Sequence, residues 1–265
     1  MKRKSRHSLT VGSSISRCRI HMRMPKSDLK PEERIILALD FPLYREARAW
    51  VERLKYRVRT FKIGPILFLN SGSDGLKGFI EGGAQIFLDL KFHDIPSTVE
   101  KASRNVAGYG IGMFTIHAMG GLRMMKAAVD AVKEESERLS KPKPLVLAVT
   151  VLTSYDEVGL KQIGVDYSPR DLVLRLAALS DRAGVDGLVS SGSEVEVLRR
   201  EFGDRFILVV PGIRIGAGTH DQKRVSTPAE AVSQGADYLV IGRAITEADD
   251  PEAVLEGIIS SISQG

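Results

Sequence analysis

The stretch IFLDLKFHDIPSTVEKASRNVAGYGIGMFTIH, residues 86–117, contains two strand-like segments with a helical segment between them. Ile86–Lys91 and Met113–His117 are short and rich in apolar residues, whereas residues 97–109 have the periodicity of a helix. A helix is the usual connection between two parallel strands, which cannot be joined by a tight turn. This stretch therefore predicts one strand-helix-strand unit of a parallel sheet.

The same alternation continues on both sides of this unit, from Glu32 to near the end of the chain. Eight strands are expected, at Ile35–Asp40, Arg59–Ile63, Ile86–Lys91, Met113–His117, Leu145–Leu152, Gly187–Ser190, Phe206–Pro211 and Tyr238–Gly242. Helices are expected near 43–55, 65–81, 97–109, 121–138, 169–183, 193–202, 228–234 and 251–262. Repeated strand-helix units of this kind are the signature of an α/β fold.

The number of units selects one α/β architecture. Eight units in the 235 residues that follow residue 30 give about 29 residues each, and a (β/α)8 TIM barrel needs about 250 residues in total. The competing doubly wound sheet would place a GxGxxG turn after the first strand, but Leu39-Asp40-Phe41-Pro42 contains no glycine. No linker follows residue 30, so the prediction is a single barrel domain over residues 31–265.

The overall composition is that of a globular protein. Of the 265 residues, 43% are hydrophobic and 27% are charged, which excludes a disordered or fibrous chain. The mean hydropathy is −0.06, and no run reaches the roughly 18 apolar residues of a transmembrane helix. No membrane partner is expected.

The positive charge is concentrated at the beginning of the chain. The formal net charge is +5, but residues 1–30 hold nine Lys and Arg against the single acid Asp28. The remaining residues hold 29 basic and 32 acidic side chains, a balance of −3. The basic character therefore does not indicate a specific nucleic-acid-binding surface on the folded part.

Residues 1–30 themselves show no strand or helix period and lack the apolar segment of a secretory signal. We expect a disordered basic extension. A transit peptide, a polybasic arm for RNA, and a true start at Met22 or Met24 are the alternatives. The only cysteine, Cys18, lies here, so no internal disulfide can form in the barrel and a reducing cytoplasm is expected.

Polar residues mark the ends of the expected strands, where barrel enzymes build their active sites. Asp40, Lys62, Asp89, Lys91 and Asp94 supply five ionised groups from the first three strands. Charged side chains that converge on one end of a barrel must either pair with one another or act in binding or catalysis. A buried ion-pair network that closes the rim is the structural alternative to a catalytic site.

The third strand carries the most informative of these groups. Side chains alternate along a strand, so Asp89 and Lys91 are expected to point the same way, with Leu88 and Leu90 on the other face. Asp94 falls in the turn beyond them. Two carboxylates near one ammonium favour its charged form, so Lys91 is expected to act as an acid or an electrostatic clamp and not as a Schiff-base nucleophile.

A phosphate site is expected after the last two strands, where this fold commonly binds phosphate. Gly242 allows close approach of a ligand, and Arg243 is a bidentate hydrogen-bond donor. The alternatives are that Gly242 serves packing and that Arg243 is a solvated surface residue. The segment from Gly212 to Thr227 is long and polar, as a lid would be, and Gln222 within it could reach a phosphate. The five histidines form no zinc motif, so no metal is expected.

Seven motifs together resemble the bacterial orotidine 5′-phosphate decarboxylase family, in the family's order over about residues 34–262. They are Leu37-Ala38-Leu39-Asp40, Phe61-Lys62-Ile63-Gly64, Asp89-Leu90-Lys91-Phe92-His93-Asp94-Ile95-Pro96, Thr150-Val151-Leu152-Thr153-Ser154, Pro211-Gly212-Ile213-Arg214, Asp221-Gln222 and Ile241-Gly242-Arg243. The resemblance implies a carboxy-lyase that converts orotidine 5′-phosphate to UMP and CO2, the last step of UMP biosynthesis, without metal or organic cofactor. It also implies a homodimer with shared sites.

The resemblance assigns a role to each matching position. Lys91 would stabilise the developing carbanion at C6 and protonate it, beside Asp89 and Asp94. Asp94 and Thr98 would lie toward the neighbouring subunit's site, with Thr98 near the ribose. The other substrate contacts would be Asp40 and Lys62 with the ribose hydroxyls, Thr153 and Ser154 with the pyrimidine, and Arg214, Gln222, Gly242 and Arg243 with the phosphate.

Two features depart from the family pattern. Ser97 stands where the family commonly has asparagine, and the basic residues 1–30 have no counterpart.

Two other functions are the alternatives to this reading of the chain. A hexulose-phosphate synthase or ketogulonate-phosphate decarboxylase shares an Asp-x-Lys-x-x-Asp strand but uses Mg²⁺, although the His93-Asp94-Ile95-Pro96 continuation argues against it. A barrel that acts as an RNA-binding scaffold through its basic arm is the second.

Overall fold

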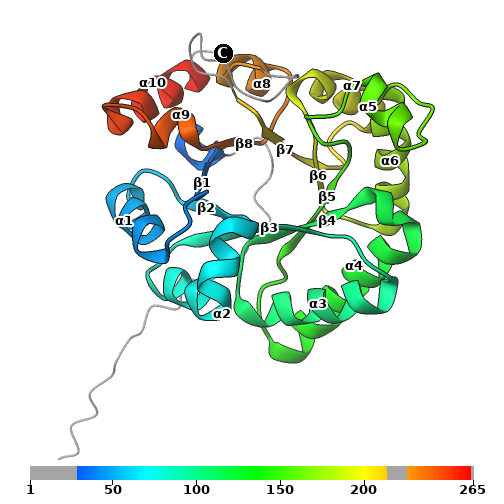
Figure 1. Ribbon diagram of the computed structural model, residues 1–265, viewed down its shortest axis with the longest axis horizontal. Helices are drawn as coiled ribbons and strands as arrows, with labels where there is room; N and C mark the ends of the chain where they lie inside the picture. Colours follow the sequence, from blue (N-terminus) through cyan, green and yellow to red (C-terminus); the bar gives the residue numbers. More distant parts are fainter. Residues whose placement is uncertain (1–28, 214–225, 264–265) are drawn as a thin grey trace, which may run out of the picture.

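The computed structural model describes residues 29–213 and 226–263, and within them the chain forms a closed barrel of eight parallel strands surrounded by helices (Figure 1). The strands are β1 (Ile35–Ala38), β2 (Thr60–Ile63), β3 (Gln85–Phe92), β4 (Met113–His117), β5 (Leu145–Val149), β6 (Gly187–Val189), β7 (Ile207–Pro211) and β8 (Tyr238–Ile241). Each strand pairs in parallel with its sequence neighbours, and β8 closes the ring on β1. The prediction of a (β/α)8 TIM barrel is confirmed.

Helices connect successive strands on the outside of the ring. The α-helices are α1 (Tyr44–Leu54), α2 (Pro65–Glu81), α3 (Pro96–Tyr109), α4 (Gly121–Leu139), α5 (Glu157–Gln162), α6 (Pro169–Ala183), α7 (Gly192–Phe202), α8 (Pro228–Ser233), α9 (Arg243–Thr246) and α10 (Pro251–Ser263). Two 3₁₀ turns, η2 (Pro31–Arg34) and η3 (Ala118–Gly120), complete the described elements. None of these helices is long and apolar enough to cross a membrane.

Two apolar layers hold the barrel together. Alternate residues of each strand face outward and pack under the helices, as Ile35 and Leu37 do on β1. The intervening residues, such as Ile36 and Ala38, face inward and form a second cluster that fills the barrel interior. This two-sided burial explains the continuous apolar runs in the sequence, because a parallel barrel strand meets apolar neighbours on both faces.

Two aspartates, the partly buried Asp186 and the buried Asp237, tie neighbouring strands together just before β6 and β8 begin. The carboxylate of Asp186 accepts the Val146 N–H at 2.8 Å, and that of Asp237 accepts the Leu208 N–H at 2.7 Å. Each aspartate also pairs with a cation, Lys143 at 2.6 Å and Arg199 at 2.7 Å. These clamps satisfy strand N–H groups at the end of the barrel opposite the carboxyl ends of the strands.

The structure differs from the sequence-based expectation at several element ends. The fifth strand ends at Val149 instead of Leu152. Thr150 still donates its backbone N–H to the Val189 carbonyl of β6, but the chain then turns at Leu152, whose carbonyl accepts the Tyr155 N–H. The short helices α5 and α9 were not expected; each is too short to show a helical period in sequence. The expected extension over residues 1–30 falls almost wholly outside the described residues and stays a prediction.

Candidate active site

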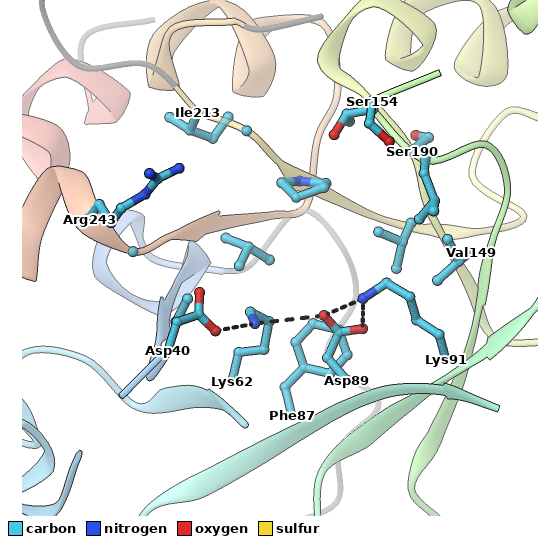
Figure 2. Close-up of a pocket in the computed structure, with 18 of the residues that line it drawn as sticks. Asp40, Lys62, Phe87, Asp89, Lys91, Val149, Ser154, Ser190, Ile213 and Arg243 are labelled. Carbon is cyan, nitrogen blue, oxygen red and sulfur yellow. Dashed lines mark hydrogen bonds and ion pairs between the residues drawn. The ribbon is translucent and has the colours of Figure 1, made fainter. Parts of the chain in front are cut away.

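A cavity of about 350 Å³ opens at the carboxyl ends of the strands (Figure 2). Inward-facing apolar residues of the barrel interior, among them Phe87, Val149, Val189 and Val240, also line this cavity and form its apolar wall. A volume of this size is within the range of small-molecule sites. Eight of the residues predicted from sequence line it: Asp40, Lys62, Asp89, Lys91, Thr153, Ser154, Gly242 and Arg243.

Four charged side chains form a row of alternating sign across one wall of the cavity (Figure 2). Lys62 Nζ lies 3.1 Å from Asp40 Oδ1 and 3.7 Å from Asp89 Oδ2. Lys91 Nζ lies 3.0 Å from both carboxylate oxygens of Asp89. The side chain of Asp89 is only 13% exposed, so its contacts with the two lysines are less screened by water than the contact of Lys62 with Asp40, which is 51% exposed. The row holds Lys91 with its ammonium at the cavity.

A bulge in β3 places Asp89 and Lys91 at this position. Leu88 pairs with Phe114 of β4, and Phe92 pairs with Ile116, so three β3 residues stand opposite one β4 residue. Lys91 adopts a φ of 50°, in the left-handed region that non-glycine residues rarely occupy. The predicted common direction of Asp89 and Lys91 is confirmed, but an irregular strand produces it instead of the regular alternation that we assumed.

Residues from β5 and β8 complete the cavity. Thr153 and Ser154 come from the segment that follows β5, and Gly242 and Arg243 follow β8. A side chain at Gly242 would place its Cβ 3.2 Å from the Ala38 Cβ, so only glycine fits there without displacing β1. Arg243 lines the same cavity as the charged row, so an anionic ligand bound there would lie among three cations, Lys62, Lys91 and Arg243.

Two predicted residues do not line this cavity. Asp94 and Thr98 are both exposed, and Asp94 Oδ1 accepts the Ile95 N–H at 2.6 Å just before α3. The expectation from the residue pattern, that two carboxylates of one chain flank Lys91, is therefore wrong for the described residues. In the charged row, Lys91 contacts the one carboxylate of Asp89, and Asp89 in turn lies between two cations, Lys91 and Lys62. Arg214 and Gln222, and most of the expected lid, lie outside the described residues.

His117 lies at the end of β4, near Lys91, and stays neutral. Its ring stacks on His93 with 5.3 Å between centroids, and its Nδ1 accepts the Met119 N–H at 3.3 Å. Burial lowers the pKa of His117 to about 4, and electrostatic interactions with His93 and Lys91 lower it further. His117 is therefore a neutral histidine at the barrel rim whose Nδ1 is satisfied by a backbone N–H.

Sequence reasoning overlooked Thr115, a fully buried residue of β4 whose hydroxyl lies 2.9 Å from Asp89 Oδ1. A signal was available, because Thr115 is the one polar residue among the apolar residues before His117 in Met113–His117. Within the described part of the chain, no group of three or more His, Cys, Asp or Glu side chains is placed to hold a metal ion.

The fold and the site together define a class: a (β/α)8 barrel with an enzyme-like cavity for a small anionic ligand, with a fixed ammonium-carboxylate pair on its wall. Comparison with known proteins narrows the class. The family described as "Orotidine 5'-phosphate decarboxylase / HUMPS family" matches residues 33–258. The chain belongs to this family.

Individual relatives support the assignment. Proteins named orotidine 5′-phosphate decarboxylase from Haemophilus influenzae and Nitrosococcus oceani are both 48% identical to the chain. The matches cover 86% and 88% of this chain, respectively, and 98% of each relative. A crystal structure of the protein of the same name from Lactobacillus acidophilus superimposes with a TM-score of 0.77 at 36% identity, covering 87% of this chain and 99% of that one.

Proposed function

We propose that this chain is an orotidine 5′-phosphate decarboxylase, which converts orotidine 5′-phosphate to UMP and CO2 in the last step of UMP biosynthesis. The observation that carries the proposal is the Lys91–Asp89 pair, held at 3.0 Å on the wall of a cavity that also presents Arg243. The proposal also agrees with the names of relatives that are 48% identical in sequence to this chain over most of its length.

The reaction needs what this pair supplies. Loss of CO2 from C6 leaves a pair of electrons on a carbon whose orbital lies in the ring plane, so no π system delocalises it. An ammonium fixed beside that carbon stabilises the developing anion and then transfers a proton to it. Lys91 has this role. Asp89, next to the substrate carboxylate, disfavours the bound substrate relative to the transition state, in which the carboxylate charge is leaving.

The remaining residues bind the parts of the substrate that do not react. Arg243 and Gly242 contact the phosphate, together with Arg214 and Gln222 from outside the described residues. Asp40 and Lys62 bind the ribose hydroxyls, and Thr153 and Ser154 contact the pyrimidine. Binding energy from a distant phosphate can be used to hold the reacting carbon against Lys91 and to exclude water from the site.

A homodimer with shared sites is part of the proposal. Asp94 and Thr98 are exposed and do not line the cavity of their own chain, and the described surface includes exposed apolar side chains, Ile95 next to Asp94 at 64% and Met119 of η3 at 39% exposure. A second copy of the chain would cover this apolar surface and would receive Asp94 and Thr98 at its own cavity. Asp94 would then complete the array of charges around the partner's lysine.

The chemistry assigned to Lys91 requires neither a metal nor an organic cofactor, and a cytoplasmic location is part of the proposal. The test is the ultraviolet absorbance of orotidine 5′-phosphate mixed with the purified protein in excess EDTA. Steady loss of the substrate signal, with UMP as product, is the expected result. Turnover that EDTA abolishes and Mg²⁺ restores would instead favour the Mg²⁺-dependent sugar-phosphate enzymes.

A further inference from the structure

Thr115 occupies a unique position relative to the reacting pair. Between the paired positions Leu88–Phe114 and Phe92–Ile116, the bulge sets Asp89, Leu90 and Lys91 opposite a single β4 residue, Thr115. One residue cannot offer a regular ladder of backbone bonds to three. The Thr115 side chain therefore stands where it can fix this part of β3 from the β4 side.

The Thr115 hydroxyl makes two hydrogen bonds, one to each member of the pair. It accepts the Lys91 backbone N–H at 2.8 Å and donates to Asp89 Oδ1 at 2.9 Å. Thr115 is 0% exposed, so water cannot replace either bond. The lysine ammonium closes the loop by contacting the same carboxylate at 3.0 Å. The hydroxyl thus joins the backbone of Lys91 to the side chain of Asp89.

We infer that Thr115 is a positioning residue for decarboxylation: its hydroxyl holds Lys91 in its left-handed backbone conformation and fixes the Asp89 carboxylate against the Lys91 ammonium. The inference rests on the proposed function. A left-handed backbone at a lysine persists only when its surroundings impose it, and the 2.8 Å bond to Lys91 N–H is such a constraint. Displacement of a reacting group by about 1 Å can cost a factor of about 100 in rate, so a lost constraint here is felt in the chemical step.

The test compares substitutions that separate the hydroxyl from the shape of the side chain. Thr115→Val keeps the branched shape and removes the hydroxyl, whereas Thr115→Ser keeps the hydroxyl. We expect Thr115→Val to lower the single-turnover rate of orotidine 5′-phosphate decarboxylation about 10- to 100-fold, with KM changed less than about 3-fold. Thr115→Ser is expected to stay within about 3-fold of the unsubstituted protein in both.

Thr60→Val is the matched control. Thr60 is also a buried barrel threonine, 3% exposed, and its hydroxyl donates to Gln85 Oε1 at 3.2 Å, but it stands at the opposite end of β2 from the cavity. It should lose thermal stability without losing rate. If Thr115→Val fails to fold, Thr115→Ser is compared with Thr115→Cys. These two variants differ in one atom, the hydroxyl oxygen of Ser or the thiol sulfur of Cys, and sulfur forms the weaker hydrogen bonds.

The outcomes separate the inference from the function. If the unsubstituted protein is active, the inference is supported by a slow single-turnover rate in Thr115→Val together with near-normal rates in Thr115→Ser and Thr60→Val. Three results with an active unsubstituted protein overturn the inference alone. They are a near-normal rate in Thr115→Val, a Thr115→Ser as slow as Thr115→Val, and a Thr60→Val as slow as Thr115→Val. If Thr115→Val does not fold, a Thr115→Cys as fast as Thr115→Ser overturns it. An unsubstituted protein that leaves orotidine 5′-phosphate unchanged overturns the proposed function, and the inference with it.

Discussion

At the scale of single residues, the site depends on a row of charged side chains in which each charge is next to one of opposite sign. Asp40, Lys62, Asp89 and Lys91 alternate in sign, and each neighbouring pair lies within 3.7 Å. Such a row is stable without a ligand because every charge has a partner. A substrate carboxylate beside Asp89 adds a negative charge that the row does not balance. Loss of CO2 leaves this charge on C6, next to the Lys91 ammonium, which neutralises it by donating a proton. The row is balanced again once Lys91 has taken up a proton from solvent, so the charged lysine favours the carbanion-like transition state over the bound substrate.

His117 gives a prediction for stability at acid pH. Its folded pKa of about 4 lies below the ordinary value of 6.5, so the unfolded chain binds the proton first as pH falls. The folded protein should lose roughly 1–2 kcal/mol between pH 6.5 and pH 5 from this group. Denaturant unfolding across this range should show a shallower acid loss in His117→Asn, whose side-chain oxygen can still accept the Met119 N–H. Identical slopes for both proteins would contradict the assignment.

Residue identities were predictable where a motif or a strand end marked them. Asp89, Lys91, Gly242 and Arg243 all occupy the cavity to which the sequence assigned them. Thr115 was not identified, because its role comes from the position of β3 beside β4 and not from its own neighbours in sequence. The orientation of Asp94 likewise depends on a local bond to the Ile95 N–H that its spacing from Lys91 does not indicate.

At the scale of elements, the two ends of the barrel have different tasks. The carboxyl ends of the strands carry the cavity, whereas the opposite ends carry the clamps made by Asp186 and Asp237. Polar groups at the clamp end are paired inside the protein and contribute to stability. Charged groups at the other end line the cavity, and one of them, Lys91, has a costly backbone conformation.

The Asp237 clamp should therefore affect stability without affecting turnover. Asp237→Ala leaves the Leu208 N–H without its side-chain acceptor and removes the carboxylate from Arg199, which is 16% exposed. We expect a loss of about 3 kcal/mol in the free energy of unfolding, measured by denaturant titration. Asp181→Ala, which breaks the exposed pair with Arg205, should cost less than about 1 kcal/mol. Equal losses in the two variants would show that the clamp is no more than a surface ion pair.

The order and type of the main elements were predictable because each strand carries its own apolar pattern and each main helix its own period. The irregularities were not. The bulge in β3 arises from a register with β4 in which three residues meet one, and register is a property of two strands. The early end of the fifth strand has a similar cause, since Val151 and Leu152 are apolar but line the cavity instead of continuing the sheet.

At the scale of the whole molecule, a single chain supplies only part of the expected site. The described residues bring the charged row, Thr153, Ser154, Gly242 and Arg243 to one cavity, and they leave Asp94 and Thr98 on the surface. The family match covers residues 33–258, so the chemistry belongs to the barrel. The proposed dimer accounts for the two surface residues.

Mixing two inactive variants tests whether sites are shared. Lys91→Ala and Asp94→Ala should each be nearly inactive as homodimers. After subunit exchange, half of the dimers are mixed, and each mixed dimer contains one site with both groups intact, so activity should return to about a quarter of the unsubstituted level. Lys91→Ala mixed with itself is the control. No recovery in a mixture shown to contain mixed dimers would mean that Asp94 serves its own chain.

The central claim is that Lys91 carries the chemistry, and single-turnover decarboxylation of orotidine 5′-phosphate by Lys91→Ala in EDTA tests it most directly. The account predicts that the rate falls by several orders of magnitude while the variant stays folded and still binds UMP, because a transition-state interaction has been removed. A Lys91→Ala variant that consumes the substrate at a rate near that of the unsubstituted protein would contradict the account.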